Sequence, residues 1–179
     1  MRTLPTLLAA LLLSGCWWEG PVFYPPDPAA EQPLQPGLYE VTDSDGKVER
    51  TRIVRAPDGS LVPGPEERKK DNSKLFFVRL PVPGRDLWIS EMISTDPAKA
   101  GAAYGLVEPR GDIITHNIVI DCDSTADLVR AAGGVVEEKE GANLTCRFND
   151  AASLERALRA YAAEHPVLDQ ELGLKRVGD

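Results

Sequence analysis

Three cysteines, Cys16, Cys122 and Cys146, are the most reactive side chains of this sequence. A cysteine thiolate can be alkylated, can form a disulfide or can bind a metal ion. Metal binding by Cys122 and Cys146 would need further ligands such as His116, but the sequence has neither a Cys-x-x-Cys pair nor histidines at metal-binding spacing. We therefore predict no metal site and no cofactor. A redox-active pair stays open as an alternative, because Cys122 precedes a predicted helix.

His116 lies near Asp121 and Asp123 in the sequence, and a histidine beside a carboxylate can act as a general base. The chain contains no Gly-x-Ser-x-Gly, His-Glu-x-x-His or P-loop motif to strengthen that interpretation. A single strand histidine is more often structural, and Asp123 is well placed to cap a helix. We expect a non-catalytic protein, with a hydrolase that uses His116 as the least favoured alternative.

The first 16 residues have the pattern of an export signal. Arg2 gives a positive start, and the apolar run from Leu7 to Leu13 is well short of the roughly 20 residues that a spanning helix needs. The segment Leu13-Ser14-Gly15-Cys16 resembles the lipobox of bacterial lipoproteins. The resemblance implies that residues 1–15 are a signal peptide, that Cys16 carries a diacylglycerol with acyl chains such as palmitate, and that the bilayer is a partner of the chain.

Trp17 occupies the position at which an aspartate often retains lipoproteins of enterobacteria in the inner membrane. We therefore expect a protein of the bacterial cell envelope, anchored to the outer membrane and facing the periplasm. With Cys16 assigned to lipid, Cys122 and Cys146 remain, and thiol pairs tend to oxidise outside the cytoplasm. We predict a Cys122–Cys146 disulfide, worth roughly 3 kcal/mol for a loop of about this length.

The charge of the chain is acidic. The net charge is −8, and removal of residues 1–15 deletes one cation, Arg2, and no acid, which takes it to −9. An acidic surface repels phosphate backbones, so we expect no nucleic-acid partner. It also argues against a basic patch for anionic lipids, which leaves acyl chains or hydrophobic insertion as the means of membrane attachment.

Residues 16–36 are predicted to be a lipid-anchored tether. Several prolines between Pro21 and Pro36 favour an extended, polyproline-like spacer that would hold the domain away from the membrane. Aromatic residues near the anchor, among them Trp18, Phe23 and Tyr24, either rest on the bilayer or pack back onto the domain.

Residues 37–179 are predicted to form one α+β domain. Short apolar runs separated by turn signals predict about six strands between residues 38 and 120, in an antiparallel meander that resembles a half-barrel. A helix–strand–helix part should follow, with helices over 125–132 and after Asn149-Asp150, where Leu154, Ala157, Leu158 and Tyr161 share one face. The residues after Pro166 form a short helix or trail off.

The favoured hypothesis is a non-catalytic binding module, held on the membrane, with an envelope protein or another envelope component as its partner. The alternative is a carrier that encloses a small apolar ligand in the curled sheet. Its candidate lining residues are Phe76, Phe77, Trp88 and Tyr104. These aromatic side chains could equally fill a solid core.

Overall fold

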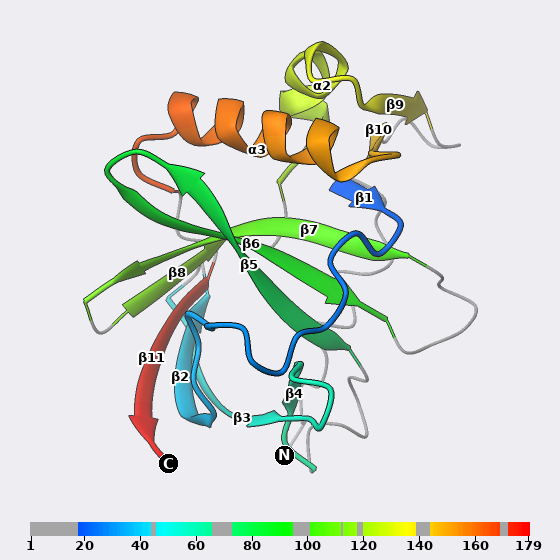
Figure 1. Ribbon diagram of the computed structural model, residues 1–179. Helices are drawn as coiled ribbons and strands as arrows, with labels where there is room; N and C mark the ends of the chain where they lie inside the picture. Colours follow the sequence, from blue (N-terminus) through cyan, green and yellow to red (C-terminus); the bar gives the residue numbers. More distant parts are fainter. Residues whose placement is uncertain are drawn as a thin grey trace.

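Figure 1 shows the computed structural model of the protein, which describes residues 18–43, 46–65, 73–94, 101–111, 113–117, 120–138, 144–168 and 172–179. Within these residues lie two helices, α2 (Cys122–Ala131) and α3 (Ala151–Glu164). The strands are β1 (Trp18–Gly20), β2 (Gly37–Asp43), β3 (Val48–Arg55), β4 (Leu61–Pro63), β5 (Lys74–Val82), β6 (Arg85–Ile93), β7 (Ala102–Arg110), β8 (Ile113–Asn117), β9 (Val135–Glu138), β10 (Leu144–Arg147) and β11 (Leu172–Gly178).

Eight of these strands close into an antiparallel barrel (Figure 1). Their order is β6-β5-β4-β3-β2-β11-β8-β7, and β7 pairs with β6 along Ala102–Val107 to complete the circle. The predicted α+β half-barrel is therefore wrong, because the fold is mainly β and the barrel is closed. A closed barrel has no free strand edges, which removes sites for unwanted pairing with other chains.

Strand β11 comes last in the described chain and lies between β2 and β8 in the barrel. It pairs with β2 on one side and with β8 on the other, so that Leu174 faces both Val41 and Ile114. Sequence patterns predicted a short helix or a loose tail for the residues after Pro166. The contacts of β11 with β2 and β8 join residues far apart in the sequence, and local periodicity does not predict such pairing.

One apolar cluster lies in the barrel interior. Side chains alternate between the two faces of a strand, so every second residue of each barrel strand points inward. The buried members of the interior cluster are Leu34, Tyr39, Leu61, Phe77, Trp88, Val107 and Leu174. Leu34 comes from outside the barrel strands, so the segment before β2 contributes to the core of the barrel.

A second layer covers the outer face of β5, β6 and β7. Helices α2 and α3, together with β1, β9 and β10, lie on this side of the barrel in Figure 1. Strand β1 joins the layer to the barrel, because it pairs with β7 on one side and in parallel with β10 on the other. The outward residues of the barrel strands, such as Leu87, Ile89 and Leu106, share a second buried cluster with Leu154 and Leu158 of α3.

The helix expected after Asn149-Asp150 is α3, and its N-cap is Asp150, which accepts a hydrogen bond from the Ser153 N–H. Leu154, Ala157, Leu158 and Tyr161 are buried, as their spacing predicted. The other helix begins earlier than expected. Asp121 rather than Asp123 is its N-cap, and the Asp121 carboxylate accepts hydrogen bonds from the backbone N–H groups of Asp123 and Ser124.

Residues 21–36, here called the strap, run from β1 across the barrel to β2. Phe23 and Tyr24 pack against the outer cluster, and the Tyr39 hydroxyl donates a hydrogen bond to the Gln35 carbonyl at 2.6 Å. Pro28 approaches the turn at Gly59 closely, since a Cβ at Gly59 would lie 2.7 Å from the Pro28 Cα. Over the described residues, the segment predicted to be a free tether therefore lies on the domain.

Candidate functional site

The candidate ligand-lining residues occupy two different faces of the sheet. Phe77 and Trp88 belong to the interior cluster of the barrel. Tyr104 belongs to the outer cluster, and Phe76 lies on the opposite face of β5 from Phe77, paired in register with Glu91. The structure therefore brings Phe77 and Trp88 together inside the barrel and leaves Phe76 and Tyr104 outside it.

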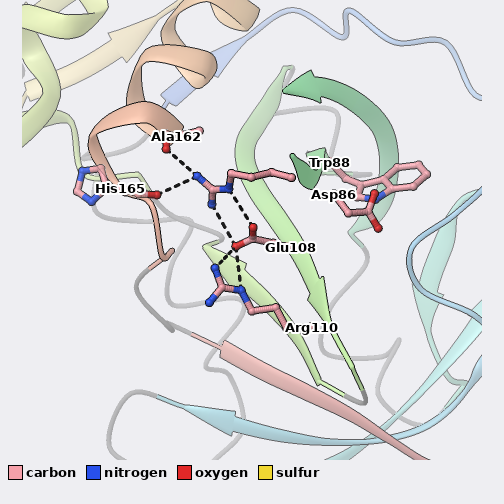
Figure 2. A network of polar contacts seen from close by, with 7 residues as sticks. Asp86, Trp88, Glu108, Arg110, Ala162 and His165 are labelled. Carbon is pink, nitrogen blue, oxygen red and sulfur yellow. Dashed lines mark hydrogen bonds and ion pairs between the residues drawn. The ribbon is translucent and has the colours of Figure 1, made fainter. Parts of the chain in front are cut away.

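Two charged side chains lie beside the Trp88 indole. The indole N–H donates a hydrogen bond to the Asp86 carboxylate at 3.1 Å, and Figure 2 shows these two side chains next to each other. The Arg79 guanidinium lies 5.6 Å from the centre of the Trp88 ring, a cation–π distance, and also pairs with Asp86 at 3.3 Å. Arg79 reaches Glu31 of the strap at 3.8 Å. The strap is thus linked to the Trp88 side of the barrel as well.

A buried ion-pair network lies where the barrel meets helix α3 (Figure 2). Arg85 of β6 donates from Nε and Nη2 to the two carboxylate oxygens of Glu108 of β7, at 2.9 and 3.1 Å. Arg110 donates to Glu108 Oε2 at 2.6 Å. The side chains of Arg85 and Glu108 are 14% and 8% exposed, so this pair is largely shielded from water.

The pKa of the Glu108 carboxyl reflects two opposing causes. Burial of the carboxylate raises the pKa, whereas the hydrogen bonds from Arg85 and Arg110 lower it, and the net result is below the ordinary value. Glu108 therefore stays ionised at neutral pH and holds both arginines in place.

Arg85 also caps the end of helix α3. Its Nη1 donates to the carbonyl oxygens of Ala162 and His165, at 2.6 and 3.0 Å. Helix C-termini leave carbonyls without partners and carry partial negative charge, so a guanidinium is well suited to this place. The His165 ring stacks on Tyr161 with 4.1 Å between ring centres. The network joins the barrel to the helical layer, since its hydrogen bonds connect β6, β7 and the end of α3.

A second buried carboxyl, Glu91 of β6, fastens the strap. Its Oε1 accepts hydrogen bonds from the Phe23 backbone N–H and the Tyr104 hydroxyl, each at 2.8 Å, and the Tyr104 hydroxyl also contacts the Pro21 carbonyl. Glu91 is fully buried, and its Oε2 has no hydrogen-bond partner. Burial raises the pKa of Glu91 above its ordinary value, despite these hydrogen bonds.

Neither buried carboxyl was predicted from the sequence, although the sequence contains a signal for both. Glu91 and Glu108 interrupt apolar strands, and each shares its strand face with apolar residues of the outer cluster, such as Ile89 and Leu106. A charged residue on a buried face needs hydrogen-bonding partners. That rule indicates a buried polar contact at each position, but the partners come from distant segments.

The predicted disulfide between Cys122 and Cys146 is present, with 5.5 Å between the Cα atoms. It joins the first residue of α2 to β10. Both sulfur atoms are used in the bond, so the alternative of two thiolate metal ligands does not apply. Among the described residues, no three His, Cys, Asp or Glu side chains gather as metal ligands would.

Both aspartates of the catalytic alternative have structural contacts. Asp121 caps α2, and the Asp123 carboxylate accepts a hydrogen bond from the Leu144 N–H at 3.1 Å. His116 lies in β8, where its backbone is in register with Val107 and Leu172. The structure gives both aspartates a role in the fold.

The anchor residue Cys16 lies outside the described residues. None of the helices that the structure describes is long and apolar enough to cross a membrane. Comparison of the chain with models of known protein families, with curated proteins and with solved structures gives no match.

Proposed function

We propose that this chain is a lipoprotein of the bacterial envelope, anchored by acyl chains on Cys16, whose barrel domain is a non-catalytic binding module. The observation that carries the anchor is Leu13-Ser14-Gly15-Cys16, placed directly after an apolar run and directly before the folded domain. Two or three acyl chains hold a protein stably on a bilayer, whereas one does so marginally.

Three further features support this proposal. The Cys122–Cys146 disulfide fits an oxidising compartment. The acidic net charge gives the chain no electrostatic affinity for anionic lipids, which agrees with attachment through acyl chains. Trp17 in place of an aspartate favours the outer membrane, with the domain facing the periplasm.

The contacts of the buried polar groups support a binding module. Arg85, Glu108 and Glu91 connect the barrel to α3 and to the strap, so they serve to hold one rigid shape. A rigid domain on a membrane anchor is a suitable platform for recognising another envelope component. The partner would be found by crosslinking in intact cells.

Growing cells that express the chain should be labelled with radioactive palmitate. We expect label in the mature band of the wild type and no label in the Cys16→Ala variant. Crosslinking of the labelled protein should then yield a specific larger species. A wild-type band without label would refute the anchor, and a protein that stays in the monomer band at every crosslinker concentration would refute the binding module.

A small-ligand carrier remains the second candidate, because a closed eight-stranded barrel can hold one small ligand. Here Leu34 of the strap fills part of the interior, so a ligand would have to displace it. Leu34→Ala should therefore increase binding of a fluorescent fatty acid. Leu80→Ala, an equally buried site in the outer cluster, is the matched control. Equal binding by both variants would remove the carrier from consideration.

A further inference from the structure

We propose that the lipid anchor holds the domain directly against the bilayer, with one defined rim of the outer layer at the headgroups. The inference rests on the proposed acylation of Cys16. The rim comprises the exposed Asp121, Asp123 and Glu138 with the half-buried Leu144. The proposed placement of the domain follows from the position of Trp18, two residues after Cys16. It reverses the expectation that a spacer keeps the domain away from the membrane.

Trp18 is fixed inside the folded domain. Its side chain is 0% exposed, and its indole N–H donates a hydrogen bond to the Thr125 hydroxyl of α2 at 3.0 Å. Its backbone is in register with Tyr104 of β7 on one side and with Cys146 of β10 on the other. The ring also packs against Phe148, with 5.2 Å between ring centres. Movement of Trp18 away from the domain would break all of these contacts.

The covalent chain limits how far the anchor can lie from this fixed point. Two residues span at most about 7 Å, at roughly 3.3–3.6 Å per residue. A diacylglycerol on the Cys16 sulfur has its acyl chains in the hydrocarbon core, which leaves the sulfur near the headgroups. The buried Trp18 must then lie within about one residue layer of the membrane surface, so the domain rests on the bilayer.

The strand directions identify the part of the domain that faces the membrane. Strands β1 and β10 are parallel, so the chain enters β1 at the same end at which β10 begins with Leu144. The Leu144 N–H donates to Asp123 in the first turn of α2, and Leu144 is paired with Glu138, the last residue of β9. The beginnings of β1, β10 and α2 and the end of β9 therefore meet at the rim.

The rim has no electrostatic affinity of its own for a bilayer. Asp121, Asp123 and Glu138 are exposed acidic side chains, which anionic headgroups repel. Contact between rim and membrane would therefore depend on the short covalent link. Lengthening the link should release the domain, and the domain without lipid should not bind vesicles of phosphatidylcholine.

The test uses a fluorophore on one added cysteine, in lipidated protein purified from membranes and reconstituted into phosphatidylcholine vesicles with a headgroup quencher lipid. Acylation occupies Cys16 and the disulfide occupies Cys122 and Cys146, so the added thiol reacts alone. Glu138→Cys labels the rim. Asn149→Cys labels an exposed position beyond the far end of β10, about 15 Å away at roughly 3.4 Å per strand residue.

We expect quenching at least twofold stronger at Glu138→Cys than at Asn149→Cys. Insertion of 12 Gly/Ser residues between Cys16 and Trp18 gives a link with a root-mean-square reach of roughly 19 Å, and it should remove the difference. Lipidated, vesicle-bound protein with equal quenching at both sites, or with a difference that survives the insertion, would overturn this inference alone. Protein that carries no lipid would overturn both this inference and the proposed anchor.

Discussion

The Arg85–Glu108 pair should contribute far more to stability than an exposed ion pair on the same barrel. Arg85→Leu removes both hydrogen bonds to Glu108 and the two to the carbonyls of α3. Removal of one partner of a buried pair costs about 3–5 kcal/mol. Because Arg110 still donates to Glu108 and is itself 43% exposed, we expect a loss of about 2–4 kcal/mol.

Thermal and urea unfolding would measure this loss. For a domain of this size, roughly 2–4 °C of Tm corresponds to 1 kcal/mol, so Arg85→Leu should lower Tm by roughly 5–15 °C. The matched control is Arg50→Leu, which breaks the Arg50–Glu40 pair between neighbouring strands β2 and β3, with side chains 67% and 31% exposed. That control should cost less than about 1 kcal/mol.

A double variant and a pH series distinguish the loss of the ion pair from general damage to the fold. Arg85→Leu combined with Glu108→Leu should be more stable than Arg85→Leu alone, because no unpaired carboxylate stays buried. The folded-state pKa of Glu108 is lowered from 4.5, so its stabilising contribution is present above pH 4.5 and is lost as the pH falls through the folded-state value. The deficit of Arg85→Leu should accordingly shrink in acid. Equal losses for Arg85→Leu and Arg50→Leu at pH 7 would show that the buried pair contributes no more to stability than the exposed one.

Three other predictions concern the disulfide and the strap. Replacing Cys122 and Cys146 together by serine should lower the free energy of unfolding in urea by about 3 kcal/mol, since the bond joins residues 24 positions apart in the sequence. A loss below about 1 kcal/mol would contradict this. The folded-state pKa of Glu91 is raised from 4.5, so the contribution of its neutral form is fully present below pH 4.5 and is lost as the pH rises through the folded-state value. Wild type should thus gain stability relative to Glu91→Gln as the pH falls from 7 to 4.5, and a constant difference would count against a raised pKa of the buried carboxyl. Gly59→Ala should destabilise more than Gly84→Ala, because both have positive φ but only a Cβ at Gly59 would collide with the strap; equal melting temperatures would mean that the strap does not lie there.

The sequence predicted the local features of this fold well. Turn signals separated the strands from β2 to β7 correctly, and the apolar spacing of Leu154, Ala157 and Leu158 identified the buried face of α3. These features depend on residues close together in the chain, where periodicity and turn chemistry act directly. The disulfide could be predicted because the chemistry of the remaining cysteines left one pairing.

The features that the sequence did not predict all depend on distant partners. Strand β11 closes the barrel through contacts with β2 and β8, and its glycine-containing run has weak strand character on its own. Trp18 lies in a proline-rich context that favours a spacer, yet tertiary packing places it in the sheet. The partners of Glu91 are the strap and Tyr104, and no local pattern connects them.

Mass spectrometry of the N-terminal peptide, from mature protein extracted from bacterial membranes, tests the acyl anchor directly. We expect a peptide that begins at Cys16 and carries a diacylglyceryl group on its sulfur. A peptide that begins at another residue, or a Cys16 thiol without lipid, would contradict the anchor and with it the proposed placement of the domain on the bilayer.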